Sequence, residues 1–137
     1  MPKRRDVFKL PALLGPMALF AATKPGELQN VVIDASKVRT NKAPFGELKI
    51  FFDGPTEQLK SITAGSLLLY AGQEPHPPHS HPDEEFMVIT EGTGEMLVDG
   101  KTYPVGPGSM MYCAPNKMHG IKAGKKNLLF YFYKWRA

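Results

Sequence analysis

The sequence has a single cysteine, Cys113, which excludes an internal disulfide framework. The fold must therefore depend on a hydrophobic core, for which 42% apolar residues are sufficient. One unpaired cysteine is compatible with either an oxidising or a reducing compartment. Because Cys113 lies in a short apolar run, we expect it to be a small buried residue on a strand. Its position six residues before His119 leaves open a place in the lining of a pocket.

Long hydrophobic runs are also lacking. The longest largely apolar stretch, residues 10–22, is interrupted by Pro11, Gly15 and Pro16. At ~1.5 Å per residue it is too short for a helix that crosses a bilayer core of ~30 Å. Outside this stretch the sequence shows neither a helical stripe of useful length nor an internal repeat. We therefore expect no stable membrane span, no helical bundle and no repeat architecture.

Most of the chain has no excess of charge of one sign. The sequence has 17 Lys and Arg against 13 Asp and Glu, a formal net charge of +4. Four of these basic residues and one of the acidic residues lie in the first 22 positions, so the rest of the chain is nearly neutral. Binding to nucleic acid requires a basic face that contacts phosphates. We therefore expect no nucleic-acid partner, and we interpret the lysines at 122–126 as a solvated loop.

The first 22 residues have the form of an export signal. A charged start that includes Arg4 and Arg5 is followed by the short apolar stretch 10–22. The arginine pair resembles a twin-arginine signal, although Phe8 lies one position later than usual and no small-residue cleavage site stands out. We predict a helical or disordered export signal at 1–22 and one domain at 23–137, in the periplasm or outside the cell. Without export the protein would be cytoplasmic.

From about residue 27 the sequence is typical of short β-strands. Apolar runs alternate with intervals that contain many of the 13 Gly and 13 Pro residues. Asp99-Gly100 is a strong signal for a two-residue hairpin turn. Short strands separated by turn signals at this spacing predict a sandwich or a barrel. The expected strands lie at 31–33, 48–53, 67–70, 85–90, 96–98, 103–105, 110–113 and 128–133.

Three of the four histidines, with one glutamate, form a pattern of metal ligands. His79 and His81 are separated by one residue, and side chains at i and i+2 of an extended segment point the same way. Glu85 opens the apolar run 86–89, while His119 must arrive from another part of the fold. Neutral imidazole and carboxylate are ligands that suit Mn, Fe, Co, Ni, Cu and Zn. We therefore predict one divalent transition metal bound by His79, His81, Glu85 and His119.

The acidic and histidine neighbours of these residues have other expected roles. Glu84 and Glu85 should point to opposite faces of one strand, with Glu85 directed inward. Glu84 and Asp83 are then expected next to the ligands or on a solvated rim. His76 lies between prolines that hold the chain extended, and we expect it at the mouth of the site.

The first motif resembles that of the cupin family. The family pattern is a glycine, about five residues, His-x-His, three or four residues, a glutamate, six residues and a glycine. Here six residues separate Gly72 from His79, three separate His81 from Glu85, and six separate Glu85 from Gly92. Only the first interval departs from the pattern, by one residue.

The second motif is similar to the cupin pattern in overall length, over residues 108–119. In the family this segment runs from a glycine through a proline-glycine turn to a histidine, which is His119 here. Pro115 comes one position late, Asn116 occupies the place of the glycine, and Ser109 replaces a common aspartate. Asparagine tolerates the left-handed backbone that such a turn requires.

The resemblance implies an all-β, single-domain jelly-roll barrel (a double-stranded β-helix) over residues 23–137. It implies one divalent transition metal (Fe, Mn, Ni, Cu or Zn) and a small-molecule substrate or ligand. Family members are often homodimers, and we expect a homodimer here. The candidate interface is an apolar outer face with Leu48, Ile50 and Phe52, and the alternative for these residues is packing between the two sheets.

Three functions remain open for such a site, because three imidazoles and one carboxylate leave positions for other ligands. The preferred hypothesis is a metal-dependent dioxygenase of a small organic substrate, such as a phenol. The second is a non-redox isomerase or lyase that acts on a sugar acid or a similar oxyanion. The third is a non-catalytic metal- or ligand-binding protein of the cell envelope. Glu85 is the expected catalytic residue, since a carboxylate that releases the metal can accept a proton.

Overall fold

The computed structural model describes residues 25–137, and nearly all regular structure in this range is β. The expected export signal, residues 1–22, lies outside the described residues. Between residues 25 and 137, no helix is long and apolar enough to cross a membrane. A short 3-10 turn, η1 (Ala35–Lys37), precedes nine strands: β1 (Asn41–Ala43), β2 (Gly46–Gly54), β3 (Ser61–Leu69), β4 (Glu84–Glu91), β5 (Gly94–Val98), β6 (Lys101–Val105), β7 (Met110–Cys113), β8 (His119–Ala123) and β9 (Leu128–Arg136).

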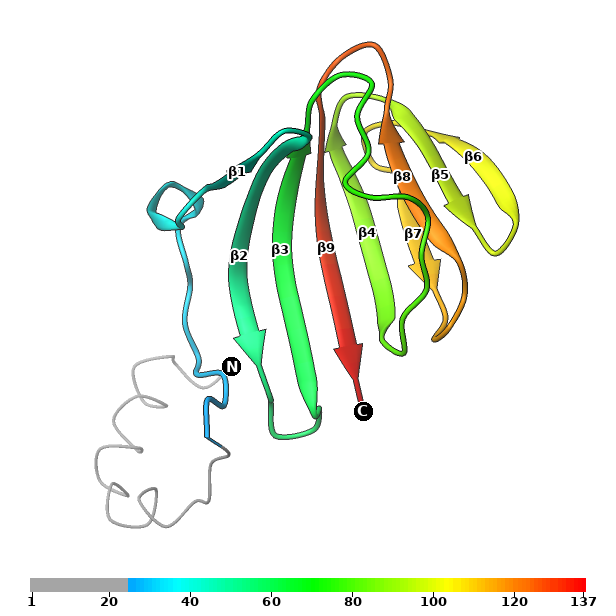
Figure 1. Cartoon of the computed structure of the whole chain (residues 1–137). Helices are drawn as coiled ribbons and strands as arrows, with labels where there is room; N and C mark the ends of the chain where they lie inside the picture. The colour runs from blue at the N-terminus through cyan, green and yellow to red at the C-terminus, as the bar shows by residue number, and fades with distance from the viewer. Residues whose placement is uncertain (1–24) are drawn as a thin grey trace, which may run out of the picture.

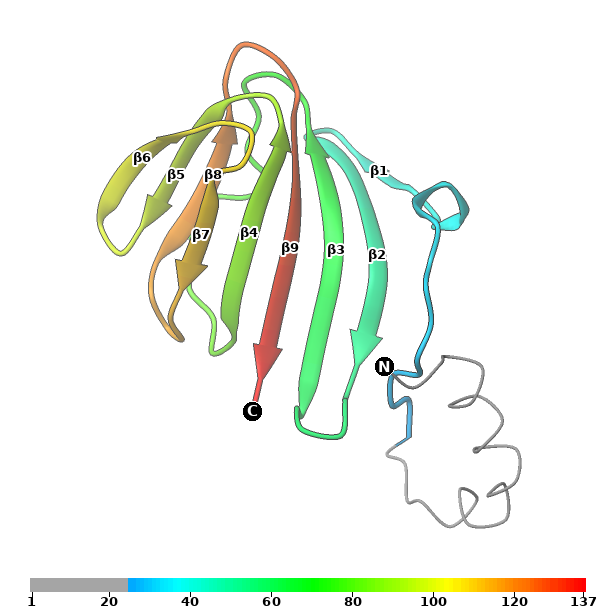
Figure 2. The same ribbon diagram turned by 180° about the vertical axis from the view of Figure 1, so that it is seen from behind.

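The strands form two sheets, which Figures 1 and 2 show from opposite sides. The larger sheet has the strand order β1-β2-β3-β9-β4-β7, and the smaller has the order β6-β5-β8. Neighbouring strands are antiparallel in both sheets. The last strand of the chain, β9, lies between β3 and β4 in the middle of the larger sheet. This topology is the all-β jelly roll that the sequence predicts.

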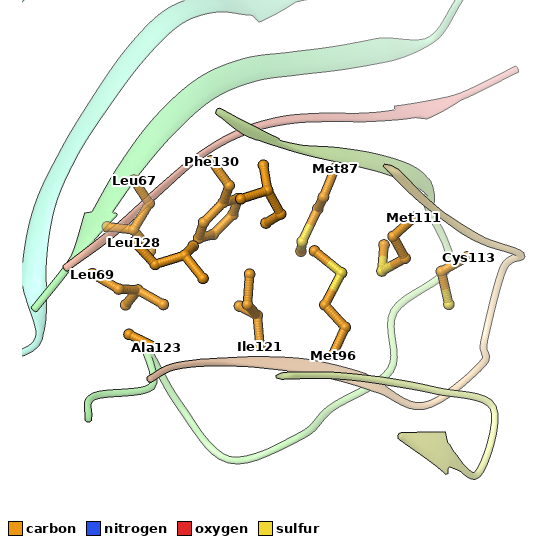
Figure 3. Close-up of a cluster of buried hydrophobic side chains, with 11 residues drawn as sticks. Leu67, Leu69, Met87, Met96, Met111, Cys113, Ile121, Ala123, Leu128 and Phe130 are labelled. Atoms are coloured by element: carbon orange, nitrogen blue, oxygen red, sulfur yellow. The ribbon is translucent and has the colours of Figure 1, made fainter. Parts of the chain in front are cut away.

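The hydrophobic core lies between the two sheets. Alternate residues of β3, β4 and β9 point towards β5 and β8, as Figure 3 shows. Removal of this apolar surface from water is the main stabilising contribution, at roughly 25 cal/mol per Å². The buried cluster consists of Leu67, Leu69, Met87, Ile89, Met96, Met111, Cys113, Ile121, Ala123, Leu128 and Phe130.

A β-bulge in β2 changes which side of that strand faces the core. The register shifts between Ile50 and Phe52, so the alternation of side chains is interrupted there. Leu48 packs against the core. Phe52 instead lies with Ala64 and Tyr133 in a groove outside the core. The prediction that Leu48, Ile50 and Phe52 share one outer face is therefore wrong, and the homodimer stays a prediction.

Two expectations about strands also differ from the structure. Residues 31–33 form no strand, and Val31 and Val32 are 59% and 96% exposed. Both side chains remain largely in contact with solvent, so an apolar run alone does not make a strand. The strands β1 and β8 were not expected, because β1 has only one apolar residue and because Gly120 and Lys122 leave the apolar pattern of β8 short.

The hairpin predicted at Asp99-Gly100 joins β5 to β6. Both residues have positive φ angles, 47° and 86°, as a type I′ turn requires. The turn fixes the β5–β6 register from Gly94↔Val105 to Val98↔Lys101.

Candidate metal centre

Backbone hydrogen bonds attach the β3–β4 connection, drawn in green in Figure 1, to the start of β8. His79 and His119 form an isolated antiparallel bridge, in which each N–H donates to the carbonyl of the other at 3.0 and 2.8 Å. The N–H of Asn116 donates to the carbonyl of His81 at 2.8 Å. Asn116 has a φ of 63°, the left-handed conformation expected from its place in the second motif. Two segments far apart in sequence are thereby held together.

The bridge and the turn bring three imidazoles to one place. Ligand nitrogens of His79, His81 and His119 all lie within 4.8 Å of one another, so the group could hold a metal ion. The rings meet edge to face, with centroid distances of 5.2 Å for His79–His81, 4.9 Å for His79–His119 and 4.7 Å for His81–His119. His119 is buried, His81 is partly buried and His79 is exposed, so the three rings extend from the interior to the surface of the protein.

Glu85 places a buried carboxylate against two of these rings. Its Oε1 lies 2.8 Å from His81 Nε2 and 3.3 Å from His119 Nε2, and the residue is 5% exposed. Glu84 points to the opposite face of β4, where its carboxylate accepts a hydrogen bond from the Tyr112 hydroxyl at 2.8 Å. The expected division between the two glutamates is therefore present in the structure.

The Nδ1 atoms of two histidines face backbone carbonyls. His119 Nδ1 lies 3.1 Å from the Lys117 carbonyl, and His81 Nδ1 lies 3.2 Å from the Asp83 carbonyl. A carbonyl oxygen only accepts, so Nδ1 carries the proton in each ring and Nε2 is left for a ligand. Among the described residues, His119 Nε2 is buried and makes no well-directed hydrogen bond, and its nearest acceptor is Glu85 Oε1 at 3.3 Å. Buried polar atoms rarely lack a partner, and a divalent cation would provide one here.

The charges of the site favour the metal-binding forms of His79 and Glu85 but favour protonation of His119. Partial removal from water, with the nearby imidazoles of His76, His119 and His81, lowers the pKa of His79 to about 4. Burial alone would raise the pKa of Glu85, but its contacts with His119 and His81 outweigh that effect and lower it. The Glu85 contact raises the pKa of His119 against an opposing effect of burial. A metal ion that binds His119 Nε2 would therefore displace the proton that this ring shares with Glu85.

A cavity of about 230 Å³ opens onto the imidazoles. This volume is below the range of ~300–1,000 Å³ that is typical of ligand pockets, so the cavity suits a small molecule. Its walls away from the histidines are mainly apolar, with a lysine among them. The lining residues are Phe45, Leu48, Leu67, Pro75, His76, His79, His81, Glu85, Met87, His119, Gly120, Ile121, Phe130, Phe132 and Lys134.

Three further candidates, His76, Asp83 and Cys113, lie around the site or in the core. The His76 ring is exposed at the mouth and stacks on His79, with centroids 3.9 Å apart and planes at 30°. Asp83 contacts His81 through its backbone carbonyl. Cys113 is buried, and its thiol donates to the Lys117 carbonyl at 3.5 Å. It is a core residue on β7 and is absent from the cavity lining.

The sequence reasoning missed Lys134. This residue lines the cavity on β9, two positions after Phe132 and four after Phe130. The signal was present in the sequence, since a lysine continues the alternate positions that are otherwise apolar in this strand. It was missed because the pairing of β9 with β4 must be known before one can say which face of β9 points into the cavity.

Comparison with known proteins agrees with this fold. Residues 66–132 match the family model described as a cupin domain. No curated protein sequence shows significant similarity to the chain. The fold is similar to that of an RmlC-like cupin from Shewanella frigidimarina, with a TM-score of 0.68 at 14% identity over 80% of this chain and 93% of the other.

Two further solved structures share the fold. A predicted oxalate decarboxylase from Thermotoga maritima has a TM-score of 0.65 at 18% identity, over 78% of this chain and 100% of the other. The polyketide cyclase RemF from Streptomyces resistomycificus has a TM-score of 0.64 at 17% identity, over 78% and 80%. At these identities the likeness shows the fold alone. Residues 66–132 are thus similar in sequence to a cupin domain, and the fold of the described residues is similar to that of solved cupins.

Proposed function

We propose that this protein is a metal-dependent dioxygenase of a small organic substrate, with one divalent metal bound by His79, His81, Glu85 and His119. The observation that carries the metal site is the buried Nε2 of His119, which makes no well-directed hydrogen bond within residues 25–137 and lies beside two other imidazoles and the Glu85 carboxylate. When bound, a redox-active metal supplies the electrons and the open coordination positions that O2 and a substrate oxygen need.

The residues of the chain would prepare the site for this chemistry. The Lys117 and Asp83 carbonyls hold two rings in the orientation that directs Nε2 inward. The apolar walls from Met87, Phe130 and Phe132 exclude water, which limits side reactions of an oxidised substrate. Glu85 is the group that can accept a proton from a bound hydroxyl, since its carboxylate already contacts two imidazoles.

The test is O2 consumption by protein loaded separately with Fe, Mn, Ni, Cu or Zn, with a panel of phenols and small oxo acids. We expect uptake with one of the redox-active metals, none with Zn, and none after His119→Ala. Glu84→Ala is the control, because the Glu84 carboxylate lies against the Tyr112 hydroxyl on the opposite face of β4 and does not line the cavity. Absence of uptake with every metal would contradict the dioxygenase.

A non-redox isomerase or lyase acting on an oxyanion is the second candidate. It is favoured by the pKa of Glu85, which is lowered so that a proton acceptor stays ionised inside the cavity. The similar structures described as a cyclase and a predicted decarboxylase bear names of reactions other than oxygenation. This function predicts turnover without O2 and with Zn as well as Mn. A ligand that stabilises the metal-loaded protein but is recovered unchanged would instead indicate a binding protein.

We also propose that residues 1–22 direct the domain out of the cytoplasm. A twin-arginine route exports folded proteins, so Mn or Fe could be installed before Zn or Cu, which bind such sites more tightly, is encountered. Replacement of Arg4 and Arg5 by lysine should retain the protein in the cytoplasm. Unchanged export of that variant would show that the arginine pair is not the signal.

A further inference from the structure

The cavity contains a cation that the proposed metal site does not use. Among residues 25–137, Lys134 is the only lysine or arginine that lines the cavity. In the same part of the chain, no carboxylate forms a salt bridge with it and no acceptor takes a hydrogen bond from its ammonium group. The next basic residue of β9 on the same face, Arg136, pairs with Asp83 and is half exposed. Of these two neighbouring cations, Arg136 therefore has a salt bridge and Lys134 has none within residues 25–137.

The strand register places Lys134 beside the metal-ligand candidates. It lies directly opposite Glu85 of β4 and opposite Thr63 of β3, so these three side chains share one face of the larger sheet. Opposed residues have Cβ atoms about 5 Å apart. The Glu85 carboxylate contacts His81 and His119 and forms no salt bridge with Lys134 among the described residues.

The nearest other acid in this row does not neutralise Lys134. Asp53 lies opposite Thr63 and accepts a hydrogen bond from its hydroxyl at 3.0 Å. It is two strands from Lys134, roughly 10 Å at the usual spacing. Across the sheet the opposed residues are therefore Asp53, Thr63, Lys134 and Glu85, and of these Lys134 and Glu85 line the cavity.

Charge balance indicates what the cavity accepts. Three neutral imidazoles and Glu85 leave one net positive charge on a bound divalent metal, and Lys134 adds a second. Uncompensated charge in a mainly apolar cavity is unfavourable, whereas an anion held by an ammonium group and a metal removes it. We propose that Lys134 binds a carboxylate of the substrate, while another oxygen of the same molecule is directed to the metal. The substrate class is a small organic acid with two oxygen-bearing groups.

This inference rests on the proposed metal site and is tested apart from catalysis. The full chain is loaded with Zn, and calorimetry compares succinate with butyrate and malonate with propionate. Each pair differs in one distal carboxylate, which a methyl group replaces. We expect the native protein to prefer the diacid in at least one pair. Lys134→Met should remove that preference, weakening diacid binding about 10- to 100-fold while leaving monoacid binding unchanged.

Matched variants separate this role from a structural one. Lys134→Arg should retain part of the preference, and Lys122→Met, which removes an exposed lysine of β8, should retain all of it. Equal affinity for both members of each pair in the native protein would overturn the proposal. Loss of Zn binding or of thermal stability in Lys134→Met would overturn it as well, because Lys134 would then support Glu85. If the native protein binds no Zn, the metal site itself is wrong, an outcome distinct from the others.

Discussion

At the scale of single residues, Glu84 and Glu85 have the same chemistry but different surroundings. Alternation along β4 sends Glu84 outward to the Tyr112 hydroxyl and Glu85 inward to His81 and His119. Only Glu85 is therefore in a position to bind a metal or to accept a proton from a ligand.

Glu85→Gln and Glu84→Gln form a matched pair of variants that tests this difference. Loss of the inward carboxylate should weaken metal binding by at least ~10-fold, a factor already seen for residues that only support ligands. Loss of the outward carboxylate should leave metal affinity unchanged. Metal titration with a competing chelator measures both. Equal effects of the two variants would show that Glu85 is not a ligand.

The contact of Glu85 with His119 gives the stability of metal-stripped protein a defined pH dependence. The pKa of His119 is raised above 6.5, so its contribution is complete below pH 6.5 and is lost as the pH rises through the raised value. The pKa of Glu85 is lowered from 4.5, so its contribution is complete above pH 4.5 and is lost as the pH falls through the lowered value. This pair should therefore stabilise the stripped protein most between those limits.

Urea unfolding in the presence of a chelator checks this dependence. The difference in free energy of unfolding between native protein and Glu85→Gln should be largest between pH 4.5 and 6.5. His79, with a pKa of about 4, acts against stability in the same window, but its ring is exposed and it is present in both proteins. A difference that does not vary with pH would contradict the assignment. Metal affinity should instead rise with pH, as His119 loses its proton.

At the scale of elements, two irregular segments carry the site. The β3–β4 connection holds His79 and His81, and the β7–β8 turn ends at His119. Neither segment gains stability from a sheet ladder, so the three hydrogen bonds between them fix their relative position. The left-handed backbone of Asn116 directs one of these bonds to His81.

Asn116→Ala tests the contribution of this turn, with Asn116→Gly as its control. A Cβ-bearing residue without a local polar group is strained at positive φ, so alanine should lower the free energy of unfolding by about 1 kcal/mol. Glycine tolerates this conformation and should have little effect. Metal affinity should fall with alanine, since the turn positions both His81 and His119. Identical stability of the two variants in urea unfolding would show that this backbone conformation is not required.

At the scale of the whole molecule, the candidate ligands come from both sheets and from the connection between them. Glu85 belongs to β4 of the larger sheet, and His119 belongs to β8 of the smaller sheet. A metal ion bound by them would join the two sheets at one end of the core. Binding to the folded state alone raises the free energy of unfolding, by about 2.7 kcal/mol when free metal is 100 times its dissociation constant.

Removal of metal should accordingly lower the melting temperature and expose residues 70–83 to proteolysis. A chelator should produce both changes in the native protein and in His76→Ala. It should produce neither in His119→Ala, which lacks the link to the smaller sheet. Calorimetry and mass spectrometry of the cleavage products provide the measurements. Identical melting with and without chelator would contradict a metal that joins the sheets.

The sequence by itself determined the class of fold and the candidate ligands. Turn signals such as Asp99-Gly100 and alternation in β4 are local properties, so the hairpin and the inward direction of Glu85 followed without knowledge of the rest of the molecule. His79, His81 and His119 were found because short spacing in an extended segment, together with the family pattern, restricts where rings can meet.

Only the tertiary structure decided which residues share the cavity and which face the outside. The bulge in β2 separated Leu48 from Phe52, and the exposed run at Val31 and Val32 had no sheet to join. The insertion of β9 between β3 and β4 placed Lys134 opposite Glu85. Strand order depends on contacts between segments that are distant in sequence, and the local pattern of residues does not determine such contacts.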